Sequence, residues 1–187
     1  MISHLKKLGL LAHWGGVGSL AVLLALSLAL AACQEDVGLP VCVEELVAAF
    51  DGLGEGPVAI RTLGGIRVEV IAGDAEGYHD GERWTLLALQ GSTIGLASPC
   101  GARELEVVLD DTQVGLTLTA YEDPRSGIAL GSARSAEALP VTEDPPYRRL
   151  TLTLPEGKAC AYAELVVDGT DCTDLCLSVL LRSVTFR

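Results

Sequence analysis

Four carboxylates lie within nine residues of one polar stretch: Asp74, Glu76, Asp80 and Glu82. Calcium takes six to eight oxygen ligands from a loop that wraps around it, so this cluster predicts a calcium site. The spacing differs from that of an EF-hand, because a tyrosine and a histidine interrupt the acidic residues. The alternative is a solvated acidic edge that keeps the protein soluble.

His79 is the only histidine after residue 32, so histidine-based nucleophilic catalysis would depend on it. Such catalysis needs a nucleophile beside the base. Residues 91–95 read Gly-Ser-Thr-Ile-Gly, which has the glycine frame of a nucleophile elbow, but Thr93 occupies the position of the serine. We therefore expect a solvated loop histidine and assign no catalytic residue, with a hydrolase that uses the acidic loops as the alternative function.

Cys33 follows the one long apolar run of the sequence. Lys6 and Lys7 precede this run, residues 17–32 are almost wholly apolar, and two alanines end it. A charged start, an apolar middle and small residues at the end are the parts of a secretory signal peptide. The sequence Leu-Ala-Ala-Cys ending at Cys33 resembles the lipobox of bacterial lipoproteins. This resemblance implies cleavage before Cys33 and attachment of lipid to its thiol.

Three segments follow from the lipobox: a helical signal peptide over 1–32, a lipidated cysteine with a short tether over 33–45, and one domain over 46–187. A protein anchored in this way lies in the cell envelope and faces the periplasm or the outside. Gln34 directly after the cysteine favours the outer membrane. The alternatives are an ordinary secretory signal and an uncleaved membrane span, although sixteen apolar residues are fewer than the ~20 that a span needs.

Six cysteines in an exported chain fit an oxidising compartment. Lipidation of Cys33 would leave five, so that at most two disulfides form and one thiol is left over: Cys42, Cys100, Cys160, Cys172 and Cys176. We expect Cys160 to pair with Cys172 or Cys176, because their segments read as adjacent strands. Cys42 with Cys100 is the second choice, and burial of some cysteines as free thiols is the alternative.

The charge of the chain excludes one class of partner. Loss of Lys6 and Lys7 with the signal peptide lowers the basic residues from 13 to 11 against 25 acidic ones, a net charge of −14. Such a chain binds neither nucleic acid nor anionic lipid through its charge. Its length and apolar content are sufficient for one folded domain with a core.

Alternation of apolar and polar residues predicts strands throughout the mature chain. The clearest strand is 114–121, where Val114, Leu116, Leu118 and Ala120 share one face. Further strands are expected over 46–51 (with a helix over 43–50 as the alternative), 66–71, 84–90, 93–97, 105–109, 128–131, 150–154, 160–167 and 177–186. Gly91-Ser92 predicts a hairpin between 84–90 and 93–97, whereas 73–82 and 139–147 are expected to be loops.

The order of these segments resembles the galactose-binding-like jelly-roll modules of exported bacterial proteins. The resemblance rests on five stretches: Phe50–Leu53, Leu63–Val68, Val114–Tyr121, Leu150–Leu154 and Leu181–Phe186. It implies an all-β antiparallel β-sandwich that binds carbohydrate or another surface polymer, often with a structural calcium and without catalysis. A protein–protein module of an envelope complex is the other alternative for the function.

Aromatic side chains could form a platform for a sugar, and the mature chain has five Trp and Tyr residues: Tyr78, Trp84, Tyr121, Tyr147 and Tyr162. Tyr121 lies on the polar face of its strand, and Tyr78 and Tyr147 lie in loops, so we expect these three to be exposed. Trp84 begins an apolar strand and is expected in the core.

Overall fold

The computed structural model describes residues 40–125, 127–135, 147–169 and 177–187 of the chain. Residues 39–187 form one compact unit. The described residues form strands joined by short connections, with one 3-10 helix: β1 (Leu46–Ala49), η1 (Phe50–Gly52), β2 (Gly56–Pro57), β3 (Ile60–Leu63), β4 (Ile66–Ala72), β5 (Ala75–His79), β6 (Trp84–Leu89), β7 (Thr93–Ala102), β8 (Glu104–Thr112), β9 (Leu116–Tyr121), β10 (Ala129–Ser135), β11 (Arg148–Thr153), β12 (Cys160–Val167) and β13 (Ser178–Phe186).

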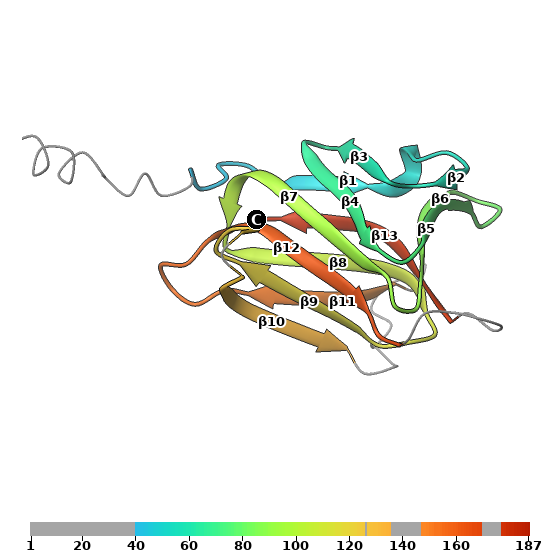
Figure 1. The fold of residues 1–187 in the computed structure, drawn as a ribbon. Helices are drawn as coiled ribbons and strands as arrows, with labels where there is room; N and C mark the ends of the chain where they lie inside the picture. The colour runs from blue at the N-terminus through green and yellow to red at the C-terminus, as the bar shows by residue number, and fades with distance from the viewer. Residues whose placement is uncertain (1–39, 126, 136–146, 170–176) are drawn as a thin grey trace, which may run out of the picture. The chain divides into compact units, whose positions relative to one another are not determined.

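Two antiparallel sheets face each other as the layers of a sandwich (Figure 1). The six-stranded sheet has the order β10-β9-β12-β7-β4-β3, and the seven-stranded sheet has the order β11-β8-β13-β6-β5-β2. β1 also pairs with β13, over Leu46–Ala49, beyond the point where the pairing of β13 with β6 ends. The edge of β13 is therefore shared between a strand from the start of the domain and one from its middle.

Strands β6 to β13 follow jelly-roll connectivity. Hydrogen bonding arranges them in two sets of four neighbours, β6-β13-β8-β11 in one sheet and β7-β12-β9-β10 in the other. This is the double Greek key of an eight-stranded jelly roll. The all-β antiparallel sandwich that the galactose-binding-like resemblance implied is therefore confirmed. The signal helix lies outside the described residues, and none of the helical structure within them is long and apolar enough to cross a bilayer.

Both sheets supply the core from the strand faces that the alternation predicted. Leu116, Leu118 and Ala120 of β9 are fully buried, as are Leu105 and Leu109 of β8 and Leu181 of β13 in the other sheet. The only two phenylalanines of the chain, Phe50 and Phe186, are also fully buried. Removal of this apolar surface from water is the main favourable contribution to folding.

Three local expectations meet different outcomes. The strand over 46–51 forms as β1 and is followed by η1, so the helix alternative is wrong. The loop over 73–82 is wrong, because residues 75–79 form β5, whose small Ala75 and Gly77 are buried against neighbouring strands. The hairpin at Gly91-Ser92 is also wrong, because β6 and β7 enter different sheets.

The cysteines pair in the second of the two expected ways. Cys42 and Cys100 form a disulfide that closes a loop with a sequence separation of 58 residues. Cys160 is a buried free thiol, so its expected pairing with Cys172 or Cys176 is wrong. Burial raises the pKa of this thiol to about 11. Cys160 is the first residue of β12, whereas Cys172 and Cys176 come in sequence after the other end of that strand. Cys33, Cys172 and Cys176 lie outside the described residues.

The segment ahead of β1 is attached to the sandwich. The Cys42 N–H donates to the carbonyl of Gly101, and the Gly101 N–H donates to the carbonyl of Pro40, at 2.9 and 2.7 Å. Together with the disulfide, these bonds fix residues 40–42 to the end of β7, although the sequence predicted a tether over 33–45.

Candidate functional site

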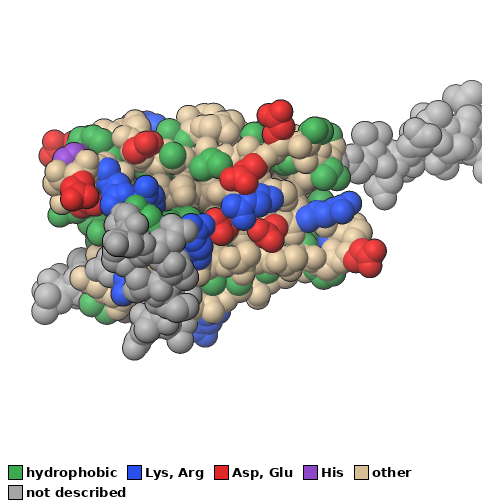
Figure 2. All heavy atoms as spheres, turned by 180° about the vertical axis from the view of Figure 1, so that it is seen from behind, with side chains coloured by type: hydrophobic (Ala, Val, Ile, Leu, Met, Phe, Trp, Pro, Cys, Tyr) green, Lys and Arg blue, Asp and Glu red, His purple; other side chains and the backbone are tan. Residues whose placement is uncertain are grey.

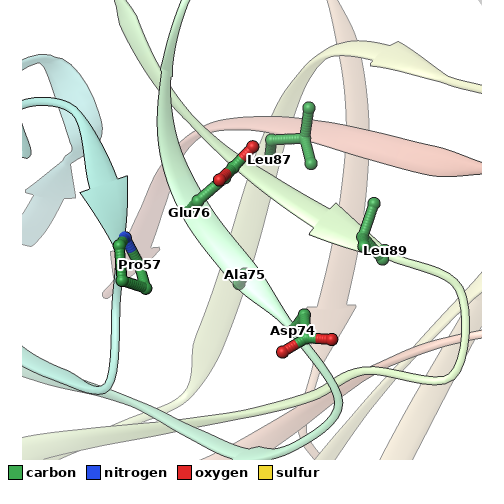
Figure 3. Close-up of a pocket in the computed structure, with 6 residues that line it drawn as sticks. All are labelled: Pro57, Asp74, Ala75, Glu76, Leu87 and Leu89. Carbon is green, nitrogen blue, oxygen red and sulfur yellow. The ribbon is translucent and has the colours of Figure 1, made fainter.

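Of the four carboxylates predicted to bind calcium, Asp74 directly precedes β5, Glu76 lies on it, and Asp80 and Glu82 lie in the turn that follows it. Asp74 and Glu76 line a hollow of about 280 Å³ whose floor includes Leu87 and Leu89 (Figure 3). The same close-up shows Glu76 beside Leu87 and Asp74 below Ala75, at separate positions along the strand. Both carboxylates are exposed.

Asp80 uses its carboxylate within its own turn. One oxygen accepts the backbone N–H groups of Glu82 and Arg83 at 2.9 and 3.0 Å, and these bonds lower its pKa. Among the described residues, the Glu82 carboxylate pairs with the guanidinium of Arg83 alone, at 3.8 Å. Over the residues that the structure describes, no group of three or more His, Cys, Asp or Glu side chains could hold a metal ion. The structure thus does not gather the four carboxylates, and calcium binding by them stays a prediction without support from these contacts.

His79 is the last residue of β5, and within the described part of the chain its contacts include no nucleophile. Its Nδ1 accepts the Gly81 N–H at 3.2 Å, and its ring packs edge-on against Trp84 with centroids 5.0 Å apart. Thr93 lies on β7 in the other sheet. Ser92 is fully buried, and its hydroxyl is bonded to the backbone of Asp74. The glycine frame of residues 91–95 is therefore a connection between the sheets.

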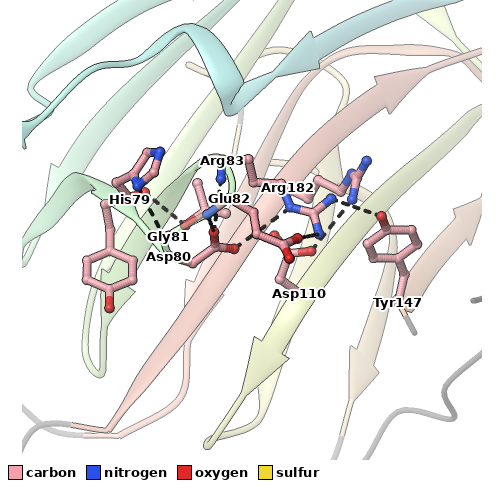
Figure 4. Close-up of polar contacts among 10 residues, drawn as sticks. His79, Asp80, Gly81, Glu82, Arg83, Asp110, Tyr147 and Arg182 are labelled. Carbon is pink, nitrogen blue, oxygen red and sulfur yellow. Dashed lines mark hydrogen bonds and ion pairs between the residues drawn. The ribbon is translucent and has the colours of Figure 1, made fainter. Parts of the chain in front are cut away.

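A second polar cluster on the outer face of the seven-stranded sheet joins β8 and β13 to the residues just before β6 and β11 (Figure 4). Arg83 donates to the hydroxyl of Tyr147 at 2.9 Å, and the guanidinium of Arg182 lies over the Tyr147 ring at 4.1 Å. Arg182 also pairs with Asp110 at 3.8 Å, and burial raises the pKa of this carboxyl more than the two arginines lower it. Tyr147 is buried here, so the expectation that it is exposed is wrong.

The rest of this outer face is also neutralised by ion pairs. Figure 2 shows acidic and basic side chains alternating across it. Arg149 pairs with Glu106 at 2.8 Å, and Arg187 pairs with Glu45 at 2.8 Å and with Glu104 at 3.0 Å. The pairs of Arg187 with Glu45 and Glu104 are solvent-exposed and add little stability each, whereas Glu106 is buried beneath Arg149. Among the described residues, these pairs leave few charges of this face free to attract a ligand.

The outer face of the six-stranded sheet has a different character. Strand pairing places two rows of outward-facing residues across β4, β7, β12 and β9. The first row is Arg67, Ala97, Tyr162 and Tyr121, and the second is Glu69, Gly95, Glu164 and Thr119. Their neighbours along each strand, such as Ala163 and Leu165, point into the core. The rows therefore bring aromatic, acidic and small residues together from four strands.

Tyr121, Tyr162 and Glu164 contact one another at the end of these rows formed by β12 and β9, and we call them the tyrosine patch. The two rings lie with centroids 6.0 Å apart and planes tilted by 41°. Tyr121 donates to one oxygen of Glu164 at 3.2 Å, and Tyr162 donates to the other at 3.0 Å. All three side chains are half-buried, so part of each remains open to a ligand.

Apolar and small residues border the patch. Gly95 lies next to it, where a Cβ would come within 2.9 Å of the Ile71 side chain and 3.1 Å of the Tyr162 hydroxyl. Ile71 on β4 and Ile60 on the edge strand β3 are 50% and 47% exposed. The face thus combines apolar surface with a few polar groups that can fix the orientation of a ligand, which is the usual composition of a binding site.

Sequence reasoning found only part of this patch. Tyr121, which the sequence predicted to be exposed, lies on the outer face of its strand but is half-buried. Tyr162 and Glu164, two residues apart on β12, carry a visible signal, because residues at i and i+2 share a strand face. The pairing of β12 with β9 carries no such signal, and it is this pairing that joins the two tyrosines.

Comparison with known proteins adds no family. No family model and no curated protein matches the sequence. Among solved structures, the chain is similar to the xylan-binding module CBM86 of Roseburia intestinalis, with 15% identity over 77% of this chain and 95% of that one and a TM-score of 0.42. It is also similar to the K2 adhesin domain of Lys-gingipain, with 13% identity over 78% and 99% and a TM-score of 0.49. A β-1,3-glucan-binding CBM6 of Bacillus halodurans has 15% identity over 80% and 98% and a TM-score of 0.38.

Similarity at these identities and TM-scores does not show what this chain binds. The class of protein follows instead from the strand connectivity, which defines a jelly-roll β-sandwich. Because one such fold serves many unrelated functions, the function has to be argued from the tyrosine patch.

Proposed function

We propose that this chain is a lipid-anchored protein of the cell envelope whose sandwich binds a carbohydrate polymer without cleaving it. The observation that carries the binding is the tyrosine patch, in which two strands present two aromatic rings and a carboxylate on one open sheet face. A tyrosine offers an apolar ring to the C–H face of a sugar and a hydroxyl to its polar groups. The carboxylate accepts hydrogen bonds from sugar hydroxyls.

Replacement of Tyr162 by alanine tests this binding. We expect retardation by a soluble neutral polysaccharide in affinity electrophoresis to weaken by about tenfold or more, a loss of about 1.4 kcal/mol. The same change at Tyr78, which is 42% exposed on the other sheet, is the matched control and should leave binding unchanged. Equal binding by the Tyr162→Ala variant and the wild type would place the binding site elsewhere.

A protein partner is the second candidate for this face. Ile60 and Ile71 are exposed beside the patch, and tyrosine is enriched in protein interfaces. The two candidates differ in outcome: wild-type protein that is retarded by no polysaccharide, yet is crosslinked in cells to another envelope protein through this face, would favour the protein partner.

The anchor rests on the sequence around Cys33. We expect Cys33→Ser to release the protein from the membrane fraction into the soluble fraction, because the thiol that takes the lipid is lost. A single acyl chain holds only marginally, whereas two or three give a stable anchor. Mass spectrometry of the mature wild type should show a lipidated N-terminal Cys33. An unmodified or disulfide-bonded Cys33 would contradict the anchor.

A further inference from the structure

The Glu164 carboxylate accepts hydrogen bonds from both tyrosine hydroxyls of the tyrosine patch. Each of its oxygens accepts one phenolic O–H, from Tyr121 and from Tyr162. Burial and the adjacent carboxylate raise the pKa of both phenols, so the two protons stay in place. With these protons committed, the three side chains offer a ligand lone pairs and no polar hydrogen.

The negative charge of Glu164 also disfavours an anionic ligand at the patch. Glu69 stands in the same row as Glu164, with only Gly95 between them across the strands. Arg67 neutralises Glu69 through an ion pair of 2.8 Å. Glu164 forms no ion pair with any residue that the structure describes, and the whole chain carries a net charge of −12. A ligand at the patch therefore meets an uncompensated carboxylate.

We propose that the tyrosine patch selects neutral glycan chains and excludes polymers of uronic acids. This selectivity rests on the proposed carbohydrate binding at the same patch. A neutral sugar brings hydroxyl groups that donate to Glu164 and to the phenol oxygens. A uronate brings a second carboxylate to a site that already holds one and has no free donor among its three side chains, so like charges oppose its binding.

A matched pair of polymers isolates the charge. Affinity electrophoresis is run with soluble β-1,3-glucan, xylan and galactan, each as its hydroxyethyl ether and as its carboxymethyl ether at equal substitution. These ethers have similar bulk and differ in charge. For the polymer that binds, we expect the carboxymethyl form to bind the wild type about tenfold more weakly or worse at 0.15 M salt, since like charges at the patch oppose it.

The Glu164→Gln variant tests the cause of this difference. Glutamine has nearly the same shape without the charge. The ratio of the affinity for the hydroxyethyl ether to that for the carboxymethyl ether, which we call the gap, should therefore fall by about threefold or more. Glu69→Gln is the control, since its charge is already paired with Arg67, and it should narrow the gap less. Circular dichroism and the melting temperature check that each variant is folded.

The outcomes separate the two proposals. If the wild type binds both ethers equally, or if Glu164→Gln leaves the gap unchanged, the selectivity is wrong and the carbohydrate binding stands. If the wild type binds none of the neutral ethers or their parent polymers, the carbohydrate binding is wrong and the selectivity falls with it.

Discussion

Replacing Cys42 and Cys100 together by serine is expected to lower the free energy of unfolding by about 4 kcal/mol. The disulfide closes a loop with a separation of 58 residues, and in the chain-entropy account its loss frees that loop in the unfolded state. The measurement is the midpoint of urea unfolding, with the slope checked for two-state behaviour.

A reductant provides the control for this prediction. Dithiothreitol should shift the wild type toward the midpoint of the Cys42→Ser/Cys100→Ser variant, and it should shift the variant itself little. Any shift that remains in the variant measures the contribution of the other cysteines. A wild type whose midpoint is insensitive to reduction would contradict the assigned role of the disulfide.

Truncation of Phe186 to alanine is expected to cost about 3–5 kcal/mol of stability. Phe186 is fully buried near the end of β13, where its backbone pairs with Leu46 of β1 and Leu105 of β8. Alanine would leave a cavity where β13 pairs with β1 on one side and with β8 on the other. Thermal and urea unfolding measure the loss.

Val43 supplies the matched control for Phe186. It is 98% exposed ahead of β1, so Val43→Ala should change the free energy of unfolding by no more than about 0.5 kcal/mol. A loss below about 1 kcal/mol for Phe186→Ala would show that the end of β13 contributes little to the core.

The strand faces could be predicted from the sequence because burial imposes a period of two on each strand. Leu116, Leu118 and Ala120 follow this rule and are all buried. β5 could not be predicted because its buried positions are Ala75 and Gly77, which are too small to produce a recognisable alternation of apolar and polar residues. A stretch that alternates small with acidic residues reads as a loop until its partner strands are known.

The strand pairing could not be predicted from neighbouring segments. In a jelly roll, most consecutive strands enter opposite sheets, so β6 does not pair with β7, and β12 does not pair with β13. The tyrosine patch was only partly visible for the same reason, because Tyr121 and Tyr162 meet through strands that are far apart in sequence.

The attachment of residues 40–42 also determines how the sandwich would bear mechanical load. Tension on the chain ahead of Cys42, such as an anchor at Cys33 would apply, passes through the disulfide into β7. β7 is hydrogen-bonded to β4 on one side and β12 on the other, whereas β1 pairs with β13 at only four positions. The covalent bond therefore shields β1 from being peeled away, and a reduced protein should unfold from its first strand at a lower pulling force.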